Sequence, residues 1–177
     1  MAKIKKIKGR QVFDSRGNPT VEAEIFSEDG NHSSAIVPSG ASTGTHEAYE
    51  LRDKENKNYL GKSVFKAVDN INGPIAKALM NIESHEQSKI DKILIELDGT
   101  EQKKKLGANA ILAVSIASCK LASRDKKVSL YKYLGNPRSS QLPIPLLNII
   151  NGGLHANNNL DIQEFMIRPE KTISFSE

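Results

Sequence analysis

The chain has 177 residues, of which 38% are hydrophobic and 26% charged, and its formal net charge is +4. This composition excludes a compositionally disordered chain, and no apolar run approaches the roughly 20 residues that a membrane-spanning helix needs. The length predicts one domain, or one domain and part of another, and it excludes a complete eight-stranded α/β barrel, which needs about 200 residues or more.

The positive charge is concentrated at the N-terminus. Five basic residues and no acidic ones lie in the first ten positions: Lys3, Lys5, Lys6, Lys8 and Arg10. They surround Ile4 and Ile7, a pattern typical of a strand with one solvated face; the alternative is an arm that binds nucleic acid. A nucleic-acid binder usually carries its basic face across the fold and stacks bases on aromatic side chains. Only 5% of the residues are aromatic, so we expect a strand and no nucleic-acid partner.

Residues 3–37 predict a small antiparallel meander of three strands. Residues 21–25 alternate between apolar and acidic side chains, which indicates a half-buried strand. The polar stretch 28–31 predicts a turn, and residues 33–37 predict the returning strand. Gly and Pro within residues 14–19 indicate the link between the first two strands.

From about residue 60 the apolar period becomes helical. Residues 64–71 place their apolar side chains on one face, and Gly73-Pro74 is expected to interrupt the helix. Ser84, with Gln87 three residues later, predicts a capping box at the start of the next helix. Gly99 predicts its end.

The last helices of this part are predicted from smaller signals. Asn109 is expected to cap a helix whose residues 110–122 are apolar or small nearly all round, which predicts a buried central helix. Cys119 lies inside it, and as the single cysteine it indicates an inert core thiol in a reducing compartment. Residues 130–134 predict a final short helix.

The order of elements predicts an α+β domain over residues 1–137, followed by a second unit over residues 138–177. The second unit begins with a linker. It then contains two short runs, 146–150 and 162–167, that are apolar on both faces. Such runs are typical of a parallel sheet or a barrel interior.

Three features carry possible chemistry. The small-residue loop 38–44 follows a strand and is either a flexible connector or a lid that covers a ligand, but it lacks the Lys of a P-loop. His155 follows a Gly-Gly turn, although a lone histidine is more often structural. Glu164 shares a strand face with Ile162 and Met166, so it needs a partner unless the strand lies at a solvated edge.

Taken together and in order, eight strings in this chain resemble the enolase family, the phosphopyruvate hydratases. They are FDSRGNPTVE at 13–22, VPSGASTG at 37–44, ELRD at 50–53, LDGT at 97–100, LGANAIL at 106–112, NIINGG at 148–153, HA at 155–156 and QEFM at 163–166. The resemblance runs collinearly from about residue 4 to residue 169. It departs locally at Leu154, where Ser is usual, and at Asn157, which is often Asp.

The resemblance implies a capping domain followed by a modified α/β barrel. It implies a lyase of glycolysis that uses two Mg²⁺ ions to convert 2-phospho-D-glycerate reversibly to phosphoenolpyruvate, with the metal stabilising the enediolate. It further implies a homodimer or higher homo-oligomer, a cytoplasmic location with secretion or cell-surface display as a second expectation, and no membrane span.

The resemblance also assigns roles to individual residues. Ser39 would be a metal ligand in the lid loop formed by Ser39, Gly40, Ala41, Ser42 and Thr43. His155 and Glu164 would be catalytic and would bind substrate together with Gln163, whereas Arg10 and Glu22 would lie at the dimer interface.

The family's three metal-binding carboxylates, its lysine base, its main acid glutamate and its phosphate-binding Arg and Ser would all lie beyond residue 177. We therefore expect a truncated chain that is inactive alone. The alternative is a non-catalytic module, derived from the capping domain, for dimerisation or surface binding.

Overall fold

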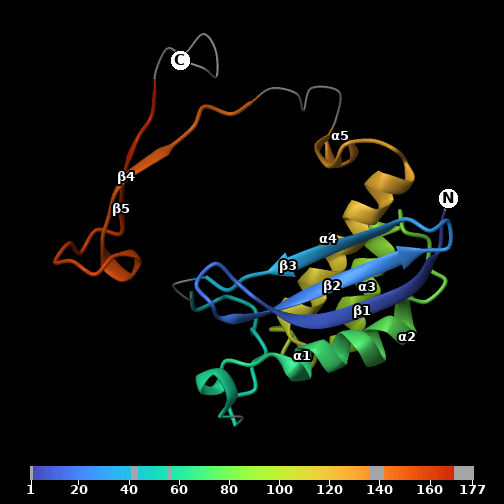
Figure 1. Ribbon diagram of the computed structural model, residues 1–177. Helices are drawn as coiled ribbons and strands as arrows, with labels where there is room; N and C mark the ends of the chain where they lie inside the picture. Colours follow the sequence, from blue (N-terminus) through green and yellow to red (C-terminus); the bar gives the residue numbers. More distant parts are fainter. Residues whose placement is uncertain (1, 41–43, 56, 136–141, 170–177) are drawn as a thin grey trace.

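The protein is described by a computed structural model that covers residues 2–40, 44–55, 57–135 and 142–169. Figure 1 shows a three-stranded sheet with helices against one face, followed in the chain by a two-stranded hairpin. The α+β prediction is confirmed. No helix within the described ranges has both the length and the apolar character needed to cross a bilayer.

The sheet has the strand order β1 (Ile4–Phe13), β2 (Pro19–Ser27) and β3 (His32–Val37), with both pairs antiparallel. The link between β1 and β2 is shaped by Asp14, whose carboxylate accepts the backbone N–H groups of Arg16 and Asn18, both at 2.9 Å. The bond from Asn18 is the main reason that the pKa of Asp14 lies below its usual value. The predicted meander and both of its turns are confirmed.

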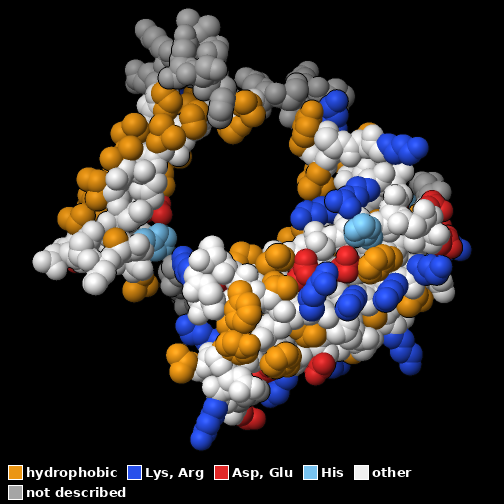
Figure 2. Space-filling model, viewed as in Figure 1, with side chains coloured by type: hydrophobic (Ala, Val, Ile, Leu, Met, Phe, Trp, Pro, Cys, Tyr) orange, Lys and Arg blue, Asp and Glu red, His pale blue; other side chains and the backbone are white. Residues whose placement is uncertain are grey.

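Alternation along the strands sorts apolar from charged side chains. The side chains of Val21, Ala23 and Ile25 on β2 are fully buried. On β1, Ile4 and Ile7 are buried between exposed lysines, and a register shift between Ile4 and Lys6 leaves two consecutive lysines in water. Figure 2 shows the resulting outer face, where Lys and Arg side chains lie beside carboxylates. The predicted solvated first strand is confirmed.

Helices α1 (Phe65–Asn70) and α2 (Ala76–Leu79) form one helical path rather than two separate helices. A π-helical turn, η2 (Ile71–Ile75), joins them and contains Pro74. Proline has no N–H and clashes with the carbonyl four residues earlier, and a wider turn accommodates both effects. The expected interruption at Gly73-Pro74 is therefore a widened turn.

Two predicted helix caps are wrong. Helix α3 (Gln87–Asp98) begins without a side-chain cap: the Ser84 hydroxyl donates to Asp125 instead, and the Gln87 amide donates to Asp91 and Ser115. Helix α4 (Ala108–Asp125) begins after Gly107, so Asn109 lies inside it. The side chains of Ser84 and Asn109 hydrogen-bond to partners distant in the sequence and not to the helix ends that their spacing favoured.

The central helix is α4, and its buried side chains are mostly Ala, Ser, Val and Leu. It packs against β2 and β3, although Leu112 is exposed and the helix is therefore not buried all round. Cys119 is half-buried, and burial together with the nearby Asp91 carboxylate raises the pKa of its thiol. A protonated thiol fits the predicted inert cysteine. The predicted last helix is α5 (Leu130–Leu134).

Asp98 closes α3 and organises the loop that follows. Gly99 adopts the left-handed conformation that ends the helix, with φ 69°, as predicted. The Asp98 side chain is buried and accepts hydrogen bonds from the N–H of Thr100 at 3.0 Å and from the N–H of Leu106 at 2.7 Å. Burial alone would raise the pKa of Asp98, but these bonds outweigh it and lower the pKa.

The substitution Asp98→Asn is expected to lower the free energy of unfolding by about 1–3 kcal/mol at pH 7, because charge-assisted bonds to a buried group are lost. Since the folded pKa lies below the unfolded value, the advantage of Asp98 is complete above the unfolded pKa of about 3.9 and is lost as pH falls through the folded value. Urea denaturation at several pH values measures this. Asp69→Asn, on the exposed surface of α1, is the matched control, and an equal loss in both variants would contradict the prediction.

The hairpin consists of β4 (Leu147–Asn151) and β5 (Glu164–Ile167), which pair antiparallel. The prediction of two strands is confirmed. Their apolar character suggested a parallel sheet or a barrel interior, and the antiparallel pairing excludes the first for these two strands. Side chains on both faces are exposed, between 41% and 59% for Leu147, Ile149, Ile150, Phe165, Met166 and Ile167. Figure 2 shows this column of hydrophobic side chains. The sequence predicted buried strands because both faces are apolar, but in this structure no other described element packs on those faces.

We expect the amides of β4 and β5 to exchange rapidly in the isolated chain, because a two-stranded hairpin without a packed face is marginally stable. The local opening free energy should be below about 2 kcal/mol, whereas β2 should approach the global value. Amide hydrogen exchange read by NMR distinguishes the two sheets. Equal protection in β5 and β2 would show that the hairpin is held by contacts absent from this structure.

Candidate active-site residues

Three of the predicted site residues meet at one end of the hairpin. His155 lies in a short 3₁₀ turn, η3 (Gly153–His155), after β4, while Gln163 directly precedes β5 and Glu164 is its first residue. The Gln163 amide nitrogen is 2.8 Å from His155 Nε2, and His155 Nδ1 is 3.2 Å from Glu164 Oε1. The side chain of Glu164 is 29% exposed and paired. Of the two alternatives for Glu164, a carboxylate with a partner or one in water at a strand edge, the structure shows the first.

The hydrogen bonds around the imidazole are consistent with a single tautomer. With the Gln163 amide nitrogen as the donor, Nε2 of His155 accepts, and the tautomer that satisfies both contacts carries its ring proton on Nδ1. That proton points to Glu164 Oε1. The arrangement orients the carboxylate and couples its charge to the ring, which is how side chains are held for proton transfer.

Gly152 allows the turn that carries His155 to lie against β5. Its N–H donates to the carbonyl of Gln163 at 2.9 Å. A Cβ atom at this position would lie 2.4 Å from the carbonyl oxygen of Ile162 and 2.7 Å from Cβ of Leu160. Only glycine permits this close approach, so Gly152 positions His155. The Gly-Gly pair after β4 was the signal for it in the sequence.

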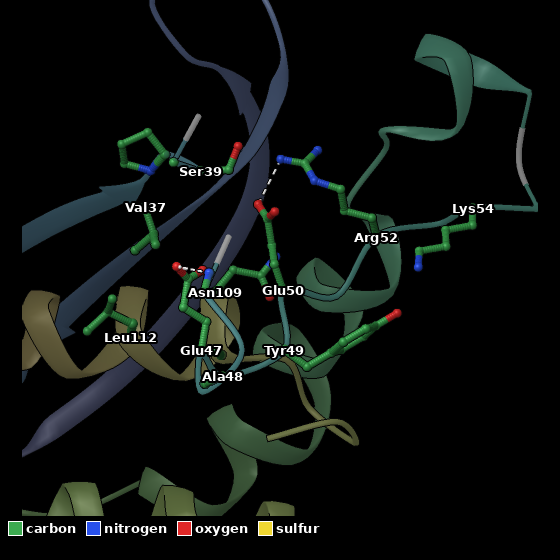
Figure 3. Close-up of a pocket in the computed structure, with 14 residues that line it drawn as sticks. Val37, Ser39, Glu47, Ala48, Tyr49, Glu50, Arg52, Lys54, Asn109 and Leu112 are labelled. Atoms are coloured by element: carbon green, nitrogen blue, oxygen red, sulfur yellow. Dashed lines mark hydrogen bonds and ion pairs between the residues drawn. The ribbon is translucent and has the colours of Figure 1, made fainter. Parts of the chain in front are cut away.

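The loop that begins at Ser39 borders a pocket of about 460 Å³. Figure 3 shows Ser39 and Arg52 at its mouth, with Glu50 between them and Leu112 and Asn109 of α4 forming the wall. Ser39 and Gly40 of the predicted lid are described and line this pocket. Ala41, Ser42 and Thr43 lie outside the described residues.

Asn109 and Gly107 fix the segment that forms the floor of this pocket. The Asn109 side chain accepts the N–H of Leu51 at 3.2 Å and donates to the carbonyl of Leu51 at 3.1 Å. A Cβ atom at Gly107 would lie 2.6 Å from Cβ of Leu51, and Gly107 has φ 94°, so this position requires glycine on both counts. The residue expected to cap a helix instead holds a loop in register with α4.

Arg52 ties three separate segments together. Its guanidinium donates to the carbonyls of Pro19 and Lys62 and pairs with Glu50 at 2.7 Å. The side chain is only 14% exposed. Composition and spacing gave no reason to single out Arg52, because its three partners come together only in the folded chain.

Ser39 and the hairpin meet at a second pocket of about 410 Å³. Ser39 and Gly40 line it from the domain side, and Leu154, which directly precedes His155, lines it from the hairpin side. Among the described residues, no hydrogen bond joins Ser39 to His155, Gln163 or Glu164. The structure thus brings the last three residues into direct contact and places Ser39 on a neighbouring wall.

Comparison with known proteins identifies the family of the chain. The family model for the enolase N-terminal domain matches residues 4–134, and the model for the enolase C-terminal TIM barrel domain matches residues 139–177. The chain belongs to the enolase family. It is 61% identical to the enolase of Pelagibacter ubique and 54% identical to the enolase of Bdellovibrio bacteriovorus, in each case over all 177 residues. The chain spans 42% of the length of these enolases.

The enolase resemblance implied Mg²⁺, and the described residues do not fit that ion by themselves. They contain no group of three or more His, Cys, Asp or Glu side chains that could hold a metal. Mg²⁺ requires near-octahedral oxygen ligands and is usually bound through carboxylates. One hydroxyl oxygen from Ser39 is not a site, so its role as a metal ligand stays a prediction.

Arg10 and Glu22, predicted at an enolase dimer interface, are partners within the chain. They lie opposite each other on β1 and β2 and form an ion pair, and Arg10 also pairs with Glu24 at 3.1 Å. The Arg10 side chain remains 44% exposed. These ion pairs join two strands of one chain, whereas the interface role stays a prediction.

The substitution Arg52→Lys should lower the free energy of unfolding by about 1–3 kcal/mol, because one ammonium cannot reproduce the forked contacts of a guanidinium. Urea denaturation measures the loss, and amide exchange across residues 49–63 should accelerate with it. The control is Arg16→Lys, since Arg16 is exposed and should change stability by less than about 0.5 kcal/mol. Equal stability of the two variants would show that the contacts of Arg52 with Pro19, Lys62 and Glu50 do not stabilise the fold.

Proposed function

We propose that this chain supplies the capping domain, residues 1–137, and the first barrel strands, residues 138–177, of an enolase that interconverts 2-phospho-D-glycerate and phosphoenolpyruvate. The observation that carries the proposal is the contact of His155 with Gln163 and Glu164 in a chain 61% identical to an enolase. This lyase activity belongs to the whole protein, as does its place in glycolysis.

The dehydration requires a group that donates a proton to the hydroxyl as it leaves the substrate. A hydroxide is a poor leaving group, so a proton must reach the departing oxygen. Glu164 is half-buried and held by His155 Nδ1, which places a carboxyl oxygen in a fixed direction for that transfer. Gln163 has an amide that can contact a substrate oxygen, and His155 lines the same end of the hairpin. We assign Glu164 and His155 to the acid–base network and all three residues to substrate binding.

The lid and the metal complete the proposal. Residues 39–43 would close over the substrate, with Gly40 as a hinge position and Ser39 contributing one oxygen to a metal. Since the described residues form no Mg²⁺ site, the carboxylate ligands must come from elsewhere in the whole protein. Two Mg²⁺ ions, a homodimer or higher oligomer that uses Arg10 and Glu22, and a cytoplasmic location with secretion or surface display as a second possibility are carried over as proposals from the family.

A second candidate is favoured by one observation. The α+β domain buries a complete core of its own, whereas the described residues lack a metal cluster. A chain with these properties would fold and bind partners without catalysing the reaction. As an isolated molecule, the chain is therefore proposed to act as a dimerisation or surface-binding module.

The test joins residues 1–177 to the remaining 58% of the Pelagibacter ubique enolase, complementary to the 42% that this chain matches, and follows phosphoenolpyruvate formation with Mg²⁺ present. The chimera should be active. Glu164→Gln and His155→Ala should each lower kcat/KM by roughly 10²-fold or more, the usual contribution of a positioned acid or base. Ser39→Ala should also lower it.

The matched control is Lys92→Ala, whose side chain is 75% exposed on α3, and it should leave the rate unchanged. The isolated 177-residue chain should form no phosphoenolpyruvate. Wild-type rates in both Glu164→Gln and His155→Ala would contradict the assigned roles. Chelator-sensitive product formation by the isolated chain would contradict the proposal that catalysis needs the rest of the enolase.

A further inference from the structure

A pocket with an unbalanced positive charge lies beside the Ser39 loop. It has a volume of about 410 Å³, and its lining residues are Arg16, Asn18, Ser39, Gly40, Arg52, Lys62 and Leu154. Three of these are cationic and none is acidic. The volume is within the range of small-molecule sites, which is about 300–1,000 Å³.

The three cations differ in how far their charge is already neutralised. Arg52 is paired with Glu50, and its guanidinium is held by two carbonyls. Lys62 Nζ donates to the neutral side chain of Asn18 at 2.9 Å, which leaves two of its three N–H donors for a ligand. Arg16 is exposed, and no hydrogen bond or ion pair from another described residue engages its guanidinium, although its charge acts on the Asp14 carboxylate. Arg16 and Lys62 are therefore the least neutralised of the three cations.

The backbone around the pocket is fixed before any ligand arrives. Asp14 accepts the N–H groups of Arg16 and Asn18, and Gly17 between them has φ 75°. This turn positions Asn18, which in turn holds the Lys62 ammonium. Asp14 lowers the local positive potential, but its carboxylate is occupied by the turn and does not line the pocket. The backbone of Arg16 and the ammonium of Lys62 are thus held before binding, which reduces the conformational entropy that a ligand must remove.

The lysine-rich outer face of the sheet provides a contrast within the same molecule. There, Arg10 is already neutralised by Glu22 and Glu24. At the pocket, Arg16 and Lys62 lie with Arg52, Ser39 and Gly40 among lining residues that include no carboxylate. Converging Arg and Lys donors with a hydroxyl and a glycine backbone are the groups that bind phosphate oxygens.

We propose that Arg16 and Lys62, supported by Arg52, form a binding site for a phosphate-type dianion beside Ser39 and Gly40. Neither the resemblance nor the proposed function assigns a binding role to these residues. The ligand class is a free phosphate or a phosphomonoester, since both present the same doubly charged group. The site needs no metal, and it stands or falls independently of the enolase reaction.

The test is an NMR titration of the ¹⁵N-labelled 177-residue chain with inorganic phosphate, glycerol phosphate or acetate, at pH 7.5 and constant ionic strength set with chloride. Phosphate or glycerol phosphate should shift the amides of Arg16, Gly17, Ser39, Gly40 and Lys62 in a saturable way. The tighter of the two identifies the source of the phosphate group. Acetate should bind more weakly, because it carries one charge.

Arg16→Ala and Lys62→Ala should each weaken phosphate binding about tenfold, the scale of one charge-assisted contact. Lys92→Ala removes the same charge from exposed α3 and should leave the affinity unchanged. Dispersed spectra establish that each variant is folded, and Lys62→Gln provides a milder second variant. Equal weakening by Lys92→Ala, shifts spread over the lysines of β1, or acetate binding as tightly as phosphate would overturn the proposal.

Discussion

Burial of one face of the sheet beneath α4 is the interaction on which the rest of this structure depends. Val21, Ala23 and Ile25 are fully excluded from solvent, and Ala113 and Ala117 of α4 are fully buried as well. Small side chains on the helix permit a close approach, and the buried hydroxyl of Ser33 donates to the carbonyl of Ala117 at 2.6 Å. The packed layer therefore contains apolar contacts with its polar group satisfied.

Around that layer, a few polar side chains hold long connections in place. Asp53 is buried and accepts the N–H groups of Phe65 at 2.6 Å and Lys66 at 3.1 Å, so it satisfies the first turn of α1 from a distance. Asp98 organises the loop before α4, and Arg52 joins Pro19 at the start of β2 to the segment before α1. Because each of these groups is partly or wholly buried, removing one partner leaves a charge or donor that water reaches poorly.

The candidate chemistry is divided between two parts of the chain that are stabilised in different ways. His155, Gln163 and Glu164 are brought together by local pairing within the hairpin, and Gly152 allows the turn to close tightly. Ser39 follows β3 at the edge of the packed domain. The two parts share one pocket, through Ser39 and Leu154, and that pocket carries the excess positive charge. A ligand there would contact both parts at once.

Much of this was accessible from the sequence, because alternation and helical period report which face of an element is buried. The meander, α3, α4 and the two strands of the hairpin followed from those periods. The capping roles of Ser84 and Asn109 did not hold. In each case a local pattern allowed two outcomes and a distant partner decided between them: Asp125 for Ser84, Leu51 for Asn109.

For the site, the sequence by itself determined the residue types and their order, because the family strings fix His155, Gln163 and Glu164 as a set. Only the tertiary structure decided that Glu164 is paired rather than solvated, that Arg52 is a tie between segments, and that Arg16 and Lys62 face one pocket with no acid among its walls. The physical reason is the same throughout. A hydrogen bond or an unbalanced charge depends on distances between segments far apart in the chain, and periodicity carries no record of those distances.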